Sequence, residues 1–112
     1  MSDASSVGAP VVVYGAGSWG TTLAILLARH GREVLLWPRG AEARRELARN
    51  RENRKYLPGF QFPASLRVAS QDTMPAPGGA PAVVATPSHG VRALLESLRG
   101  TNSAAWVLAA KG

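Results

Sequence analysis

The chain has 112 residues, enough for one domain with a modest core, and a formal net charge of +6 at pH 7. It contains no cysteine, which excludes a disulfide framework and thiolate chemistry and fits a cytoplasmic protein. No segment is apolar over enough residues to span a membrane, so we expect no membrane partner.

The first residues differ from the rest of the chain. Residues 1–9 are small and polar and lack the basic segment and apolar stretch of a signal peptide. We expect them to form a disordered leader, followed by one domain over residues 10–112.

Within residues 10–112, short apolar runs alternate with segments of helical periodicity. This pattern predicts strands at 10–14, 33–37, 66–69, 82–86 and 104–110, and helices at 18–29, 41–50 and 90–98.

Two connections between these elements are marked by Pro and Gly. Pro58 and Gly59 predict a turn after the second helix, and residues 71–81 predict an irregular connection. Strands that alternate with helices indicate an α/β fold, with a doubly wound parallel sheet and right-handed crossovers.

The first strand leads directly into a glycine pattern. Three valines at 11–13 are typical of a strand buried on both faces, and Gly15, Gly17 and Gly20 follow with the spacing G-x-G-x-x-G. Strand, loop and helix in this order predict a Rossmann-like dinucleotide site. Gly15 permits the sharp turn, Gly17 lets a diphosphate approach the backbone, and Gly20 lets the helix pack closely. Gly31 stands where that helix should end. The alternative is a tight turn without a ligand.

Ligands of a parallel sheet bind outside the carboxyl ends of its strands. Gly15, Arg39 and Lys111 each follow a predicted strand, as do Pro87 and Ser88, so four loops should meet at one crevice. We expect Pro87 and Ser88 to contact the cofactor, and Ser88 could also cap a helix.

The end of the second strand indicates which dinucleotide is bound. A protein that binds NAD is expected to carry an acidic residue here, which accepts hydrogen bonds from the adenosine ribose, and none is present. Arg39 stands there instead, and its planar guanidinium suits a 2′-phosphate. The sequence therefore favours NADP, with NAD as the alternative. A solvated Arg39, or one stacked on adenine, remains open.

Much of the positive charge lies between residues 39 and 55. Basic residues alternate there with Glu42, Glu46 and Glu52, a pattern typical of a solvated helix face. No set of stacking aromatic residues, helix-turn-helix pattern or zinc spacing accompanies it, so we expect no nucleic-acid partner. An anionic cofactor and a phosphorylated substrate explain the charge more simply. The basic residues are Arg39, Arg44, Arg45, Arg49, Arg51, Arg54 and Lys55.

A few single residues admit two interpretations. His89 should face the crevice, but a helix-start residue with a local hydrogen bond explains it better than a catalytic base. Trp37 and Trp106 lie in apolar strands and are expected in the core. Trp19 lies in the glycine loop, where contact with a ligand or another domain is as good an explanation as packing. No cluster of metal ligands is present, so no metal site is predicted.

Five segments together carry a family resemblance. They are Gly-Ala-Gly-Ser-Trp-Gly-Thr-Thr at 15–22, Leu-Leu-Trp-Pro-Arg at 35–39, Asn-Arg-Glu-Asn-Arg-Lys-Tyr-Leu-Pro-Gly at 50–59, Thr-Pro-Ser-His at 86–89 and Ala-Lys-Gly at 110–112. From about residue 10 onward, the chain resembles the amino-terminal domain of the bacterial NAD(P)-dependent glycerol-3-phosphate dehydrogenases. These enzymes interconvert glycerone phosphate and sn-glycerol 3-phosphate, the backbone of phospholipids.

The resemblance implies roles for individual residues. Ser18 and Trp19 would line the diphosphate and nicotinamide side of the cofactor, and Arg39 would meet the adenosine ribose or its phosphate. Tyr56 would close over the cofactor. Lys111 would contact both cofactor and substrate, where its ammonium can attract a carbonyl or phosphate oxygen. The implied partner is a small-molecule substrate, and a homodimer is one state open to the full-length protein.

The chain also departs from the family pattern. Gly40 stands where the family often has a second basic residue, which weakens the argument for NADP. The family's catalytic lysine belongs to a carboxyl-terminal helical domain, so we expect no catalytic residue here and interpret the chain as a truncated first domain. Two alternatives stay open: a non-catalytic NAD(P)-binding module, and the first domain of another β-hydroxyacid-type dehydrogenase.

Overall fold

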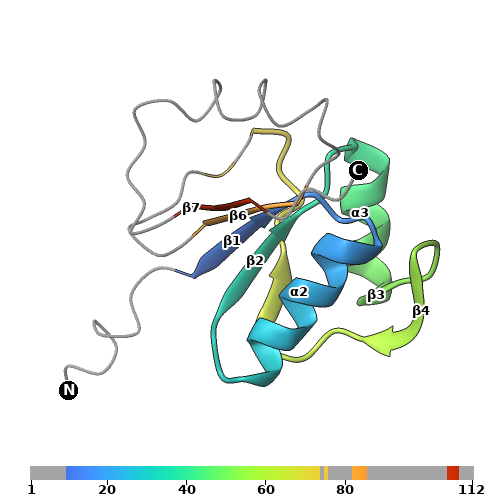
Figure 1. Ribbon diagram of the computed structural model, residues 1–112. Helices are drawn as coiled ribbons and strands as arrows, with labels where there is room; N and C mark the ends of the chain where they lie inside the picture. The colour runs from blue at the N-terminus through green and yellow to red at the C-terminus, as the bar shows by residue number, and fades with distance from the viewer. Residues whose placement is uncertain (1–9, 74, 76–81, 86–105, 109–112) are drawn as a thin grey trace, which may run out of the picture.

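The chain folds around a five-stranded parallel sheet (Figure 1). The computed structural model describes residues 10–73, 75, 82–85 and 106–108. The strands of this sheet are β1 (Val11–Tyr14), β2 (Val34–Trp37), β5 (Leu66–Val68), β6 (Ala82–Val84) and β7 (Trp106–Leu108). The described helices are α2 (Ser18–Arg29) and α3 (Ala41–Asn50), and a separate antiparallel pair joins β3 (Glu52–Asn53) to β4 (Leu57–Gln61).

The strand order places β1 in the middle of the sheet. The order is β5-β2-β1-β6-β7, and every neighbouring pair is parallel. Val12 of β1 pairs with Leu35 on one side and Ala82 on the other. The chain thus builds the sheet outward from β1 in one direction and then in the other. In open α/β sheets, the point where this direction changes is where ligands bind.

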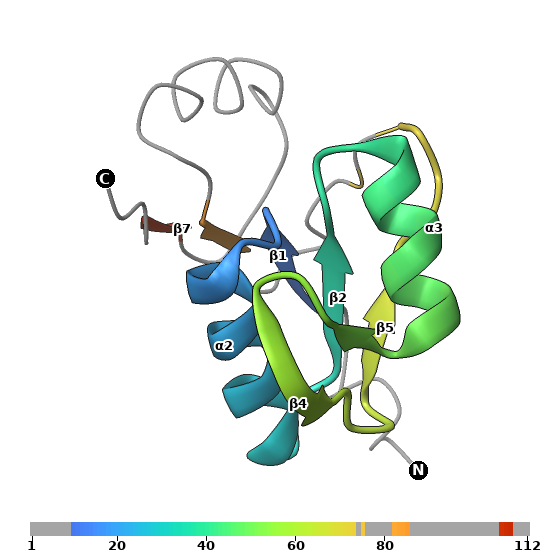
Figure 2. The same cartoon turned by 90° about the vertical axis from the view of Figure 1, so that its right-hand side faces the viewer.

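The two described helices cover the same face of the sheet (Figure 2). Alternate residues of β1, Val11 and Val13, point to that face, as expected from the two-residue period of a strand. They form one buried cluster with Ile25 of α2 and Leu47 of α3. A parallel sheet with this order and these crossover helices confirms the predicted Rossmann-like α/β fold. The helix predicted at 90–98 lies outside the described residues.

The opposite face of the sheet has its own buried cluster, which includes Val12, Tyr14, Trp37 and Val84. The Tyr14 hydroxyl donates to the carbonyl oxygen of Pro75 at 2.6 Å, and burial raises the pKa of Tyr14 from 10.0 to about 12. Trp37 is 7% exposed, which confirms its predicted place in the core.

Several predicted boundaries agree with the structure. Both described helices have the predicted bounds, and each strand of the large sheet lies within its predicted range. Gly31 follows the end of α2 with φ at +90°, a conformation that glycine adopts without strain. Its amide donates to Ala28 at 3.1 Å, and the next amide, of Arg32, donates to Leu27. The helix therefore ends as the glycine predicted.

The segment after α3 was predicted wrongly. Pro58 and Gly59 lie within β4 rather than forming the turn, which instead spans residues 54–56. The amide of Gly59 donates to the Glu52 carboxylate at 2.9 Å, across the hairpin. Proline is tolerated there because β4 is an edge strand, where a missing amide hydrogen bond costs little.

Several expectations concern residues that the structure leaves undescribed. The leader at 1–9 lies outside the described residues, and the connection at 71–81 is described only in part. Within the described part of the chain, no helix combines the length and apolar character that crossing a bilayer requires.

Candidate functional site

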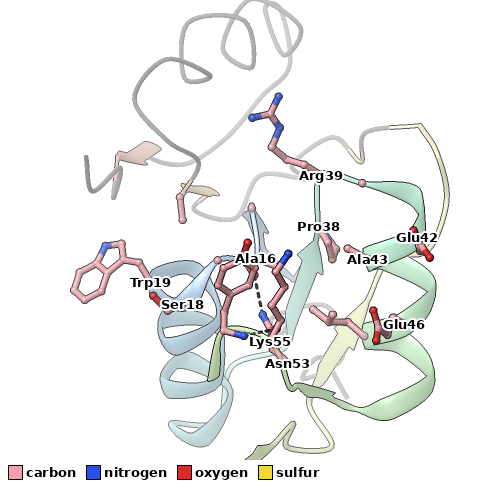
Figure 3. A pocket seen from close by; sticks show the side chains of 16 residues that line it. Ala16, Ser18, Trp19, Pro38, Arg39, Glu42, Ala43, Glu46, Asn53 and Lys55 are labelled. Carbon is pink, nitrogen blue, oxygen red and sulfur yellow. Dashed lines mark hydrogen bonds between the residues drawn. The ribbon is translucent and has the colours of Figure 1, made fainter. Parts of the chain in front are cut away.

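A cavity of about 900 Å³ opens at the carboxyl ends of the central strands (Figure 3). Its walls come from the loop after β1 with the start of α2, the loop after β2, helix α3, the β3–β4 hairpin, and Ala85 after β6. The sequence predicted that the first two loops meet, and the family resemblance placed Tyr56 at the cofactor, but the hairpin that carries Tyr56 was not predicted. The lining residues are Gly15, Ala16, Gly17, Ser18, Trp19, Pro38, Arg39, Gly40, Glu42, Ala43, Glu46, Leu47, Asn53, Lys55, Tyr56 and Ala85.

The three glycines after β1 have the geometry that a dinucleotide loop requires. Gly15 has φ at +106°, and its amide donates to the carbonyl of Trp37 at 2.9 Å. A Cβ at Gly17 would meet no atom within 4 Å, so the cavity wall is open there. A Cβ at Gly20 would overlap the carbonyl oxygen of Gly15 and lie 3.0 Å from the Cβ of Ala85. Gly20 therefore allows close packing and Gly17 leaves space for a ligand.

The amino terminus of α2 opens into this cavity. Gly17 is its N-cap and supplies no side-chain hydrogen bond, and the first turn holds no acidic residue. The first backbone bond runs from the amide of Thr21 to the carbonyl of Gly17 at 3.0 Å. The amides of the first turn have no partner within the helix, and they carry its positive dipole end. This terminus is suited to an anion such as a diphosphate.

Asn53 ties the hairpin to the glycine loop, a role the sequence analysis missed. The residue is 1% exposed, and its side chain donates to the carbonyl of Ala16 (Figure 3) and to the Thr21 hydroxyl, both at 2.8 Å. Its amide oxygen accepts from the backbone amide of Tyr56 at 3.2 Å. The only available signal was the position of Asn53 inside the segment 50–59 that carries the resemblance.

The hairpin places Lys55 and Tyr56 at the cavity wall. Tyr56 is 50% exposed, and the Lys55 ammonium lies 5.2 Å from the centre of its ring. Trp19, 46% exposed, lines the cavity from the first turn of α2. The exposed Tyr56 ring provides apolar surface for a planar ligand group, whereas the Trp19 ring points outward from the start of α2, away from Arg39 and Asn53 (Figure 3). The exposure of Trp19 also removes the core-packing explanation for it.

The loop after β2 contributes Arg39, which is exposed and lines the cavity as predicted. Arg44 contradicts the expectation of a solvated face, because it is 4% exposed. Its guanidinium donates to the carbonyls of Pro38 and Arg39 and pairs with Asp72. It also lies over the ring of Trp37, with Cζ 4.7 Å from the ring centre. Three acceptors and an aromatic face replace part of the water around the guanidinium, whereas Nε is buried without a hydrogen-bond partner among the described residues.

The predicted site residues fall into three groups. Gly15, Gly17, Ser18, Trp19, Arg39 and Tyr56 line one cavity, and Gly20 packs beneath it. Pro87, Ser88, His89 and Lys111 lie outside the described residues, so their predicted contacts stay predictions. Among the described residues, no group of three or more His, Cys, Asp or Glu side chains could hold a metal ion.

Comparison with known proteins agrees with this geometry. The family model described as NAD-dependent glycerol-3-phosphate dehydrogenase N-terminus matches residues 10–112. A glycerol-3-phosphate dehydrogenase [NAD(P)+] from Prosthecochloris aestuarii is 49% identical over 92 residues, which cover 82% of this chain and 28% of that protein. One from Stenotrophomonas maltophilia is 43% identical over 100 residues, covering 86% and 29%.

Solved structures show the same similarity. The crystal structure of glycerol-3-phosphate dehydrogenase from Coxiella burnetii has a TM-score of 0.75 and 30% identity, covering 91% of this chain and 33% of that one. The yeast glycerol-3-phosphate dehydrogenase has a TM-score of 0.72 at 21% identity, and this similarity concerns the fold alone. The chain thus spans less than a third of the curated relatives it matches, 28% of the first.

Proposed function

Since this chain belongs to the NAD-dependent glycerol-3-phosphate dehydrogenase N-terminal family, we propose that it is the cofactor-binding part of an sn-glycerol-3-phosphate dehydrogenase [NAD(P)+]. In the parent reaction, a hydride passes from the reduced nicotinamide to the carbonyl carbon of glycerone phosphate, and a proton joins the oxygen. The product, sn-glycerol 3-phosphate, serves phospholipid synthesis. The cofactor supplies the hydride, and the residues of this chain bind and orient it.

The observation that carries this proposal is the open space at Gly17 beside the uncapped start of α2. A diphosphate placed there would contact backbone amides directly, as it does in dinucleotide-binding loops in general. Asn53 fixes the loop from behind, and the exposed Tyr56 ring lies at the cavity wall. These features fit a nicotinamide dinucleotide better than they fit a simple turn.

We assign the adenosine end of the cofactor to the loop after β2. No carboxylate stands at the end of β2 to accept from the ribose hydroxyls, and Arg39 lines the cavity there. Glu42 and Glu46 line the cavity from α3, so the wall is not uniformly basic. We propose NADP as the preferred cofactor on the basis of Arg39, with NAD as the alternative.

The remaining assignments concern residues beyond the described part of the chain. We propose that Pro87 and Ser88 contact the cofactor and that Lys111 contacts both cofactor and substrate. We assign no catalytic residue to this chain, since the family's catalytic lysine belongs to another domain. The parent protein would act on a small-molecule substrate in the cytoplasm, with a homodimer as one open state and neither nucleic acid nor membrane as partner.

Calorimetric titration of the 112-residue chain with NADPH and NADH tests the proposal. NADPH should bind more tightly, and Gly17→Val should lower its affinity at least tenfold, by about 1.4 kcal/mol or more. Gly17 has φ at −73°, which any residue adopts, so valine adds bulk without backbone strain. The matched control is Ala64→Val, at an exposed position away from the cavity, which should bind normally. If neither cofactor binds the folded wild type, the proposal fails.

Arg39→Asp tests the choice of cofactor. The substitution places a carboxylate where an NAD-binding protein carries one, so affinity should shift from NADPH towards NADH. An unchanged ratio of the two dissociation constants would show that Arg39 does not contact the 2′-phosphate. The same samples should not reduce glycerone phosphate, and efficient turnover would contradict the assignment of proton transfer to another domain.

A further inference from the structure

Arg44 is a buried cation beside the loop after β2, and it has no assigned contact with the cofactor. Its side chain is 5% exposed, yet its acidic partner Asp72 has a side chain that is 85% exposed. The two lie on different segments, the second turn of α3 and the chain after β5, with 3.0 Å between Nη2 and Oδ1. An ion pair with an exposed carboxylate offsets little of the desolvation cost of burying an arginine. The other contacts of Arg44 must therefore account for its position.

Those other contacts all belong to the end of β2 and the loop that follows it. Nη1 of Arg44 donates to the carbonyl oxygen of Pro38 at 2.8 Å and to that of Arg39 at 2.9 Å. Cζ of Arg44 also lies over the ring of Trp37, the last residue of β2. One side chain therefore holds two successive peptide groups of the loop, directly beside the position that carries Arg39 into the cavity.

This arrangement fixes the direction of both peptides. All described peptide bonds are trans, and in a trans peptide the carbonyl and the following amide point in opposite directions. With the carbonyls of Pro38 and Arg39 turned onto the buried guanidinium, the amides of Arg39 and Gly40 point away from it. Within the described residues neither amide donates a hydrogen bond to protein. The carbonyl oxygens of Pro38 and Arg39, which carry the negative ends of the peptide dipoles, therefore face Arg44 and not the bound cofactor.

We propose that Arg44 is a positioning residue for cofactor selection, which holds the Pro38–Gly40 loop so that Arg39 and the adjacent amides face the 2′-phosphate of NADP. The proposal rests on the proposed binding of NADP at this loop. Arginine is required because its planar fork can serve two carbonyls and a carboxylate at once and stack on Trp37. Lysine keeps the charge but offers one nitrogen in place of the fork.

The test compares two ligands that report only on the adenosine end. Adenosine 2′,5′-bisphosphate and adenosine 5′-monophosphate differ in the 2′-phosphate, so the ratio of their dissociation constants measures its recognition. Arg44→Lys should lower the preference for the bisphosphate about tenfold, equivalent to about 1.4 kcal/mol. Arg45→Lys, the same change at the adjacent exposed position, should leave the preference unchanged. An equal loss in this control would overturn the proposal.

A double-mutant cycle separates positioning from general destabilisation. In an Arg39→Met background, Arg44→Lys should change the preference less than it does in the wild type, because part of its effect passes through the Arg39 side chain and only the part carried by the adjacent amides remains. Independent and additive losses would overturn the proposal. A merely structural role would lower the unfolding temperature and weaken both ligands equally, which would leave the ratio unchanged.

Asp72→Ala keeps the proposal testable if Arg44→Lys fails to fold. Asp72 lies outside the cavity lining and is exposed, and its loss frees one nitrogen of Arg44, so the preference should fall about threefold. A wild-type ratio in each folded variant would overturn the inference while leaving cofactor binding intact. If the wild type binds the two ligands equally, the proposed preference for NADP fails, and the inference fails with it.

Discussion

Replacing Asn53 with alanine should destabilise the fold and loosen the glycine loop together. The side chain is buried and makes three hydrogen bonds, to the carbonyl of Ala16, the hydroxyl of Thr21 and the amide of Tyr56. Each intramolecular hydrogen bond contributes about 1 kcal/mol net, and partners left buried without a replacement cost more. The free energy of unfolding should therefore fall by about 3 kcal/mol.

Chemical denaturation and thermal unfolding measure this loss. For a domain near this size, a loss of 3 kcal/mol lowers the unfolding midpoint by more than about 10 °C. Asn50→Ala is the matched control, since Asn50 ends α3 and is half-buried but makes none of these contacts. It should change the free energy of unfolding by no more than about 0.5 kcal/mol.

Asn53→Asp tests the donor amide alone, because the variant side chain keeps the shape of asparagine and the oxygen that accepts from Tyr56. The donor amide becomes a carboxylate oxygen, which would face the carbonyl of Ala16 at about the same separation. The NADPH affinity of this variant should fall more than its stability predicts, because negative charge is added behind the diphosphate loop. The reasoning is refuted if Asn53→Ala loses less than about 1 kcal/mol, or if Asn53→Asp binds NADPH like the wild type.

Two further predictions concern the sheet and the helix packed on it. Gly20→Ala should lower the free energy of unfolding by more than about 2 kcal/mol in denaturant titrations, because the new Cβ would overlap the Gly15 carbonyl. The control Gly17→Ala should stay within about 1 kcal/mol of the wild type. Equal losses in the two variants would refute the packing role of Gly20. Burial raises the pKa of Tyr14 to about 12, so the neutral form is favoured in the folded state. The contribution of Tyr14 to the free energy of unfolding should be fully present below pH 10 and should fall by about 2–3 kcal/mol as pH rises from 10 to 12. Tyr14→Phe should lack this loss in parallel unfolding measurements.

The sequence predicted those elements whose ends are set by local chemistry. The bounds of α2 follow from Gly17 at its start and Gly31 after its end, and both positions have backbone conformations that suit these roles. The continuous valines of β1 indicated a strand buried on both faces, and their side chains do divide between two buried clusters. The position of Arg39 at the end of β2 predicted its place at the site, and the family resemblance added Tyr56; both residues line the cavity.

The hairpin could not be predicted in this way, because its strands lack a local signal. β3 has two residues, its pairing is irregular between Glu52 and Asn53, and β4 is mostly exposed. Pro58 and Gly59 normally mark turns, and only the pairing with β3 and the Glu52 carboxylate hold them in a strand. These contacts depend on how the chain returns after α3, which composition and periodicity do not encode.

Arg44 and Asn53 escaped prediction for a shared reason: each is a polar side chain in a polar segment, and burial depends on partners distant in space. Among the described residues, the buried polar or charged ones are these two and Thr21. Asn53 holds the loop after β1 through Ala16, and Arg44 holds the loop after β2 through Pro38. Polar groups are costly to bury, and well-packed apolar residues that replace all partners of such a group can be equally stable, whereas removing one partner destabilises the fold. Their presence at both walls of one cavity therefore argues that they fix loop geometry for a ligand, and a stable chain with apolar residues at both positions should bind NADPH poorly.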